Sequence, residues 1–205
     1  MKSSNSKAGL RPVVFVLSGP SGAGKDSVLN HLKSHLPALE HIITATTRRC
    51  RPGEQDGMHY RFLPVADFHA MIDRHELLEY ANVYGNWYGV PNNPLREALA
   101  AGKDTIIKVD VQGAMSIREV LPDSVLLFLM PPCREDLVTR LQRRNTEAEA
   151  DLERRLQTAG EEMEKLPFFD YAIVNADGQI EKVVSEIVAI ITAEKLRTAS
   201  RHYEF

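Results

Sequence analysis

The chain has 205 residues, of which 43% are hydrophobic, so it is long enough to bury a full core without a metal or a disulfide framework. Its formal net charge is −3 and its arginines stand in short groups, a distribution that argues against a nucleic-acid partner. The two cysteines, Cys50 and Cys133, lack metal-ligand spacing and favour a reducing compartment. The first apolar run is too short to span a membrane and leads into a glycine-rich loop, so we expect neither a cleaved signal nor a membrane partner, but a cytoplasmic protein.

The N-terminal part predicts a strand, a phosphate-binding loop and a helix. Residues 12–18, PVVFVLS, are β-branched and aliphatic, as in a buried strand, and residues 25–36, KDSVLNHLKSHL, have aliphatic side chains at helical spacing. Between them lies GPSGAGKDS, residues 19–27. Its glycines allow backbone N–H groups to turn onto a phosphate, Lys25 reaches the outer oxygens, and the helix N-terminus adds partial positive charge. Asp26 stands where the pattern has a Ser or Thr hydroxyl that helps to hold magnesium, and a carboxylate is also a magnesium ligand.

The rest of the chain predicts an insert followed by further strands and helices. Residues 41 to about 94 are rich in arginine, aromatic side chains and glycine and have only short apolar runs, which indicates an inserted subdomain. Strands that alternate with helices predict an α/β fold whose parallel sheet is covered on both faces. The predicted elements are a helix at 94–102, strands at 104–111 and 124–132, a helix at 134–144, a strand at 169–175 and a helix at 178–196.

Two segments of the insert carry groups that suit a second ligand. TATTRRCRPGEQDGMHY, residues 44–60, has Arg48, Arg49 and Arg51 close together, and clustered guanidinium groups suit a phosphate. Taken alone, however, a solvated basic loop is the better interpretation. Glu79 follows two leucines in LLEYANVYGNWYGV, and an isolated glutamate is by default solvated.

These segments together resemble the guanylate kinase family. SGPSGAGK, TTRRCRPGEQDGMHY, LLEYANVYGNWYG, VDVQGA and PPCREDLVTRLQRR each match a family block in order, and the similarity extends from Val13 to about Leu196. The resemblance implies a P-loop NTPase-type parallel sheet with flanking helices, an inserted GMP-binding subdomain and a mobile lid. It also implies transfer of the γ-phosphoryl group of ATP to GMP, with Mg²⁺ entering with ATP, and leaves monomer or homo-oligomer undecided. The implied division is core with the phosphate loop at 12–40, GMP-binding subdomain at 41–94, core at 95–140, lid at 141–156, and core with the C-terminal helix at 157–205.

The resemblance implies three sets of site residues. The ATP site would contain Gly19, Pro20, Ser21, Gly22, Ala23, Gly24, Lys25, Asp26 and Ser27, with Asn175 near the adenine and Asp26 as the metal ligand. The GMP site would contain Arg48, Arg51, Tyr60 and Tyr88 at the phosphate, and Thr44, Glu79 and Asp110 at the guanine or its surroundings. The catalytic cations would be Lys25, Arg48 and the lid arginines Arg140, Arg144 and Arg155.

Physical chemistry agrees with these roles. Guanine has N–H donors at N1 and at its exocyclic amine, which a buried Glu79 carboxylate accepts, whereas adenine has an acceptor at N1. Such a site rejects an analogue that leaves its polar groups unpaired by up to about 10⁴–10⁵-fold. The acceptor phosphate is already an oxyanion, so the transfer needs positioning and charge neutralisation and no general base. Closure of the lid would exclude water that otherwise attacks ATP.

Three residues depart from the family pattern. Asp26 replaces the loop hydroxyl. Val90 follows WYG, where the family usually has a Ser or Thr that helps to hold guanine, so base discrimination would rest on Glu79 and Thr44. Lys108 stands where the family commonly has a carboxylate, two residues before Asp110. We hypothesise that Lys108 either contacts phosphate or pairs with Asp26, which would keep the local charge balanced.

Two other interpretations stay open. GKDS together with YGV also resembles the ribose 1,5-bisphosphate kinases, but those have no use for Glu79 and do not require the TTRRCRPGE block. A guanylate-kinase-like binding module would use the GMP site as a phosphopeptide groove. Such modules lack an intact phosphate loop, so Lys25 and the lid arginines argue for retained chemistry.

Overall fold

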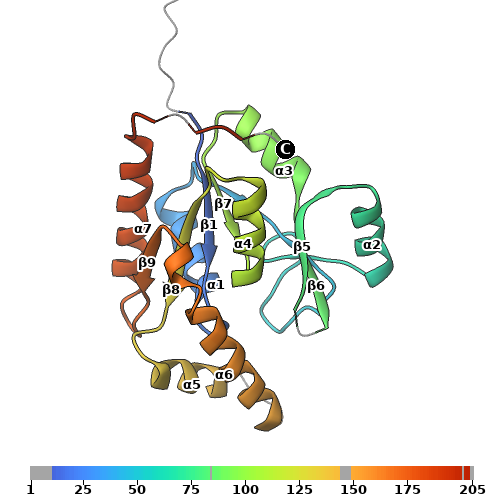
Figure 1. Ribbon diagram of the computed structural model, residues 1–205, viewed down its shortest axis with the longest axis vertical. Coiled ribbons are helices and arrows are strands. Elements are labelled where there is room, and N and C mark those ends of the chain that lie inside the picture. Colours follow the sequence, from blue (N-terminus) through green and yellow to red (C-terminus); the bar gives the residue numbers. More distant parts are fainter. Residues whose placement is uncertain (1–10, 84, 144–148, 200, 204–205) are drawn as a thin grey trace, which may run out of the picture.

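The computed structural model describes residues 11–83, 85–143, 149–199 and 201–203. Its centre is a five-stranded sheet in the order β2-β7-β1-β8-β9, and all neighbouring strands are parallel (Figure 1). The strands are β1 (Val14–Ser18), β2 (Glu40–Ile42), β7 (Thr105–Lys108), β8 (Val125–Met130) and β9 (Tyr171–Val174). This confirms the predicted parallel α/β sheet.

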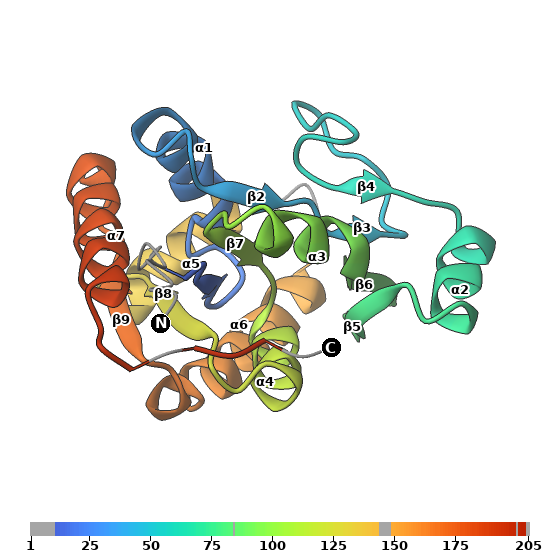
Figure 2. The same ribbon diagram turned by 90° about the horizontal axis from the view of Figure 1, so that it is seen from above.

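Alternate residues of β1 enter two separate cores. Phe15 and Leu17 pack on the face covered by α1 (Lys25–His35) and α7 (Ile180–Lys195), whereas Val14 and Val16 pack on the opposite face. The helices on that opposite face are α3 (Asn92–Ala100) and α4 (Val111–Val120). Figure 2 shows the sheet between these two layers. All five residues of β1 are fully buried, so the loop that follows it starts from a rigid base.

The insert forms a second, four-stranded sheet in the order β4-β3-β6-β5, at the right of Figure 1. Its elements are β3 (Ala45–Thr46), β4 (Arg61–Phe62), α2 (Val65–Asp73), β5 (Leu77–Val83) and β6 (Asn86–Pro91). Trp87 on β6 stacks with Phe68 on α2 at 6.1 Å between ring centroids, which attaches the helix to this sheet. The preceding strand β2, residues 40–42, pairs with β7 and therefore belongs to the main sheet.

Two helices, α5 (Arg134–Arg143) and α6 (Glu149–Met163), lie below the main sheet in Figure 1 and are followed by the short 3₁₀ helix η1 (Leu166–Phe168). Leu137 and Leu141 on α5 form a small core with Leu156 and Ala159 on α6. The same two leucines reach Gly22, where an added Cβ would lie 3.1 and 3.3 Å from them. The base of this helix pair is therefore packed against the phosphate loop.

The observed elements agree with the predicted ones at all the strands and helices named from periodicity, with ends that differ by a few residues. Three α-helices were not predicted separately. They are α2 within the insert, α4, which starts directly after β7, and α6, which includes part of the segment assigned to the lid. None of the helices in the described ranges has the length and apolar character required to cross a lipid bilayer.

Candidate functional site

The phosphate loop depends on glycine at two positions. Gly19 has φ 137°, and a Cβ there would lie 2.0 Å from the backbone oxygen of Leu129 on β8. Gly24 has φ 95° as the residue before α1, and its Cβ would lie 2.4 Å from Nδ2 of Asn175. Any other residue at these positions would displace the loop from β8 or from Asn175, so the predicted strand, loop and helix have the geometry expected of a phosphate site.

Lys25 and Asn175 fix the loop from two sides. Lys25 is partly buried, and its ammonium donates to the backbone oxygens of Gly19 at 2.5 Å and Pro20 at 3.2 Å. Burial lowers the pKa of Lys25, and nearby carboxylates, chiefly Glu162, act in the opposite direction. The Asn175 amide donates to the backbone oxygen of Ala23 at 2.7 Å. Asn175 thus holds the outer side of the loop, and its contact with adenine stays a prediction.

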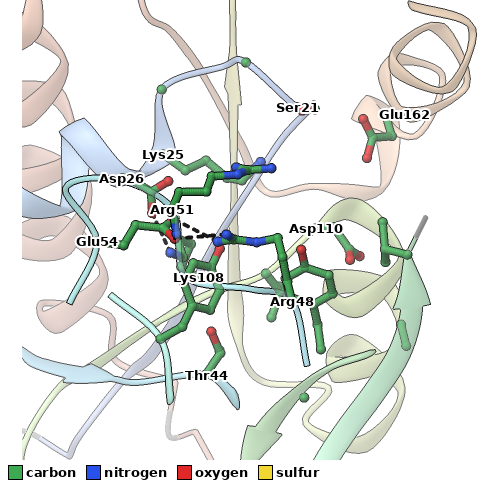
Figure 3. A pocket seen from close by; sticks show the side chains of 18 of the residues that line it. Ser21, Lys25, Asp26, Thr44, Arg48, Arg51, Glu54, Lys108, Asp110 and Glu162 are labelled. Atoms are coloured by element: carbon green, nitrogen blue, oxygen red, sulfur yellow. Dashed lines mark hydrogen bonds and ion pairs between the residues drawn. The ribbon is translucent and has the colours of Figure 1, made fainter. Parts of the chain in front are cut away.

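A cleft of about 370 Å³ opens in front of this loop, bounded by the insert, the end of β7 and α6 (Figure 3). It brings together residues that are far apart in the sequence. The predicted site residues that line it are Ser21, Gly22, Gly24, Lys25, Asp26, Thr44, Arg48, Arg51, Tyr60, Glu79, Tyr88, Asp110 and Arg155. ATP-site and GMP-site predictions therefore meet in one cavity.

One wall of the cleft is built around Arg48. Its guanidinium makes two hydrogen bonds with Glu54, at 2.9 and 2.8 Å, and lies 5.3 Å from the ring centroid of Tyr60. Glu54 also accepts from the backbone N–H of Arg51 at 2.8 Å. Burial opposes the charge of Arg48, but Glu54 and Tyr88 outweigh it and raise the pKa of Arg48. The sequence analysis gave Glu54 no role, although its place just after a Pro-Gly turn allows it to fold back on Arg48.

Tyr60 and Tyr88 meet edge to face within this wall, with ring centroids 6.0 Å apart. Tyr60 precedes β4, and Tyr88 lies on β6, so the contact joins two segments of the insert that are distant in the sequence. Burial raises the pKa of Tyr60. Two phenols and the two arginines of this wall form a polar surface that suits a phosphate.

Glu79 is a buried carboxylate that faces the cleft from β5. Its side chain is 7% exposed, and its Oε2 has no hydrogen-bond partner among the residues that the structure describes. Burial, followed by the charge of Asp110, raises the pKa of Glu79 to about 8. Gly113 in the first turn of α4 permits this close approach, since an added Cβ would lie 3.2 Å from Glu79 Oε2. A buried acid without a partner is costly unless a ligand satisfies it.

The other residues predicted near the guanine have different positions around Glu79. Asp110 caps α4 by accepting from the Gly113 N–H at 2.7 Å, and Thr44 is buried at the cleft wall. Val90 lies opposite Glu79 in the β5–β6 register, but its side chain is fully buried in the core on the side of α3 and α4. Val90 therefore offers the cleft no polar group.

The hypothesis that Lys108 pairs with Asp26 is confirmed. The Lys108 Nζ lies 2.5 Å from Asp26 Oδ1, and the lysine side chain is 7% exposed. Burial opposes the charge of Lys108, but Tyr60 and then Asp26 outweigh it and raise the pKa of Lys108. The exchange of residue types at positions 26 and 108 thus produces an ion pair between a buried ammonium and a partly exposed carboxylate at the edge of the cleft.

Other predicted residues lie behind the loop or outside the described residues. Gly19, Pro20, Ala23 and Ser27 shape the loop or begin α1 and are absent from the cleft lining. Arg140 points away to the end of β9, where it bonds with Asp177 at 2.7 Å and with the backbone oxygen of Asn175 at 2.6 Å. Arg144 lies outside the described residues.

Glu162 on α6 is a cleft residue that the sequence analysis did not identify. It lines the cavity near Lys25, and its Oε2 is buried with no hydrogen-bond partner in the described part of the chain. Burial raises the pKa of Glu162 to about 7, with Lys25 acting in the opposite direction. Because Arg155 lies seven residues earlier on α6 and also lines the cleft, one face of this helix borders the site.

The donor set of the cleft fits magnesium that arrives with a nucleotide. The described residues hold no group of three or more His, Cys, Asp or Glu side chains that could bind a metal ion. Magnesium usually needs only one or two carboxylates when phosphates and water supply the remaining oxygens. Asp26 beside Lys25 meets that requirement.

Comparisons with known proteins show the family of the chain. A family model described as guanylate kinase matches residues 11–194. Guanylate kinase from Desulfitobacterium hafniense is 40% identical over 193 residues, covering 94% of this chain and 96% of the relative. Guanylate kinase 2, chloroplastic/mitochondrial, from Oryza sativa is 43% identical over 192 residues, covering 93% of this chain and 67% of the relative.

Solved structures show the same relationship. The crystal structure of guanylate kinase from Anaplasma phagocytophilum has a TM-score of 0.75 at 33% identity and covers 92% of this chain and 88% of that chain. Shikimate kinase from Acinetobacter baumannii, with a TM-score of 0.50 at 17% identity, covers 94% and 99% and shares the fold alone. Since the matched residues include the phosphate loop, the Arg48 wall and Glu79, the chain belongs to the guanylate kinase family.

Proposed function

We propose that this protein transfers the γ-phosphoryl group of ATP to GMP and releases ADP and GDP. The observation that supports it best is the position of Glu79, a buried carboxylate without a hydrogen-bond partner among the described residues, in the same cleft as the phosphate loop. Guanine would satisfy this carboxylate with two N–H donors. The phosphate of GMP would then lie on the wall formed by Arg48, Arg51, Tyr60 and Tyr88.

The cations of the cleft support phosphoryl transfer between the two ligands. Lys25 belongs to the loop that would hold the ATP phosphates, and Arg48 to the wall that would hold the acceptor phosphate. Arg155 approaches from α6 on the third side. Positive groups around a transferring phosphoryl stabilise its equatorial oxygens, and the acceptor oxyanion attacks without a base.

Magnesium would neutralise part of the polyphosphate charge when it is bound with ATP, and Asp26 is the residue that would hold it. The Asp26 carboxylate would then contact both the magnesium and the ammonium of Lys108. Lys25 would leave the backbone oxygens of Gly19 and Pro20 to reach the phosphates.

The two alternatives fit the cleft less well. A sugar bisphosphate has no N–H donors for Glu79 and would leave this carboxylate buried and unsatisfied. A phosphopeptide module has no use for an intact glycine loop with a lysine that lines the cleft. The ATP:GMP reaction uses both halves of the cleft.

A coupled assay of ADP release tests the proposal. The purified protein with magnesium and ATP receives GMP, AMP or ribose 1,5-bisphosphate in separate runs. We expect turnover with GMP alone, and Lys25→Met should abolish it. Turnover with the sugar bisphosphate would support the first alternative. GMP binding without turnover for any acceptor would support the binding module.

A further inference from the structure

Lys108 places one ammonium between the two phosphate-binding parts of the cleft. Its Nζ lies 2.5 Å from Asp26 Oδ1 and 3.7 Å from the ring centroid of Tyr60. Asp26 is in the first turn of α1, next to Lys25, whereas Tyr60 belongs to the arginine wall of the insert. A single side chain thus contacts both the first turn of α1, which follows the phosphate loop, and the arginine wall of the insert. Figure 3 shows Lys108 beside Asp26.

The main sheet holds Lys108 rigidly in this place. It is the last residue of β7, and its backbone lies opposite Leu17 of β1, the strand that leads into the phosphate loop. Its side chain is 7% exposed, unlike Lys103 just before the same strand, whose side chain is 52% exposed. A buried lysine is costly without a partner, so its ion pair and its contact with the Tyr60 ring account for its burial.

Building on the proposed function, we propose that Lys108 is a positioning residue for phosphoryl transfer, which neutralises Asp26 beside the ATP phosphates and holds Tyr60 at the acceptor phosphate. The two contacts have separable consequences. Without Lys108, the Asp26 carboxylate would lose the ammonium that faces it, and its negative charge would act more strongly on the polyphosphate. Without Lys108, Tyr60 would also lose the cation that faces its ring, whatever residue stands at position 26.

The experiment compares Lys108→Met, Asp26→Asn and the double variant Asp26→Asn with Lys108→Met. Calorimetry with ATP and EDTA, without magnesium or an acceptor, gives the ATP affinity of each protein, so the metal contact of Asp26 does not enter the comparison. Lys108→Met should weaken ATP binding by about 100-fold, because the Asp26 carboxylate next to Lys25 loses its ammonium partner and repels the phosphates more strongly. The double variant should recover about tenfold or more of that loss, because the carboxylate itself is removed.

The Michaelis constant for GMP should follow a different pattern. Both proteins that lack Lys108 should show a similar increase of about tenfold in the KM for GMP, because both lack the contact with Tyr60. Asp26→Asn alone should leave this KM close to that of the unchanged protein. A purely structural role of Lys108 would instead change the melting temperature and both substrate affinities together.

Lys195→Met is the matched control, since Lys195 forms a largely buried ion pair with Asp104 at 2.8 Å away from the cleft. It should lower the melting temperature and leave ATP affinity unchanged. If Lys108→Met does not fold, Lys108→Arg and the double variant carry the test, and Lys108→Arg should retain ATP affinity within about threefold because it keeps the charge.

A double variant whose ATP affinity is as low as the product of the two single losses would overturn the proposed role of Lys108. Equal ATP affinities in Lys108→Met and the unchanged protein would overturn it as well. Absence of GMP turnover by the unchanged protein would instead refute the proposed function, whereas the ATP calorimetry still decides whether Lys108 compensates Asp26.

Discussion

Replacement of Glu79 by glutamine should make the protein more stable and less active, and the gain in stability should grow with pH. Burial raises the pKa of Glu79 to about 8 from an ordinary value of 4.5. The folded protein therefore keeps the proton that the unfolded chain loses above pH 4.5, so ionisation costs folding free energy as the pH rises towards 8. Glutamine has no such ionisation.

The size of the effect follows from the two pKa values. Between pH 5 and pH 8.5, the advantage of Glu79→Gln in the free energy of unfolding should grow by up to about 4 kcal/mol, at 1.36 kcal/mol per pKa unit. Water that enters the cleft screens part of this penalty, so an increase of at least about 1 kcal/mol is the expected minimum. Glu79 as a whole residue is 7% exposed, which keeps the screening limited.

Urea unfolding of both proteins at several pH values without nucleotide measures this increase. Glu97→Gln, on an exposed position of α3, is the control and should show no comparable growth with pH. In the coupled assay, Glu79→Gln should lower kcat/KM for GMP by about 10²–10³-fold, because one acceptor of guanine N–H groups becomes a donor. A stability difference that stays constant from pH 5 to pH 8.5 would show that Glu79 is not buried as an acid.

Three other substitutions test the remaining walls of the cleft. Glu162→Gln should lower the KM for ATP about threefold at pH 8. In the unchanged protein this KM should rise through pH 7, because the Glu162 carboxylate, with a pKa of about 7, ionises beside Lys25 and repels phosphate, and the variant should flatten that rise. Unchanged pH profiles of the KM would contradict this. Glu54→Gln should raise the KM for GMP about tenfold, because Arg48 loses its bidentate partner, whereas an unchanged KM would show that Arg48 is held otherwise. Asn175→Ala should weaken ATP binding about tenfold in calorimetry and leave GMP binding unchanged, since only the loop loses a buried hydrogen bond; equal losses for both ligands would refute this.

Local signals made the first strand, the loop and the first helix predictable. The apolar run, the glycines and Lys25 are adjacent in the sequence, and each has a conformational reason that does not depend on distant residues. Even here, the requirement for glycine at position 19 comes partly from β8, because the Leu129 oxygen fills the space of a Cβ. The sequence identifies the glycine, and the fold supplies the second reason for it.

Apart from Glu54, whose partner Arg48 is only six residues away, the residues that were missed depend on contacts between distant segments. Glu162 comes to the cleft only because α6 packs on α5, whose leucines rest against Gly22. Gly113 matters only because Glu79 approaches the first turn of α4. The strands β3 and β4 have two residues each, too short for any periodicity to indicate a sheet.

The charged groups of the cleft divide into two kinds with opposite effects on stability. Arg48 with Glu54 and Lys108 with Asp26 are ion pairs, and removal of one partner leaves a charge uncompensated in a partly buried place. Glu79 and Glu162 have raised pKa values and an oxygen without a hydrogen-bond partner in the described chain, so their ionised forms cost folding energy. A group that destabilises the folded protein is retained only if it serves another purpose, and a carboxylate aimed into a ligand cleft has such a purpose in binding. Substitutions that remove one partner of an ion pair should therefore lower stability and binding together. Neutral substitutions of Glu79 or Glu162 should instead raise stability while they change affinity.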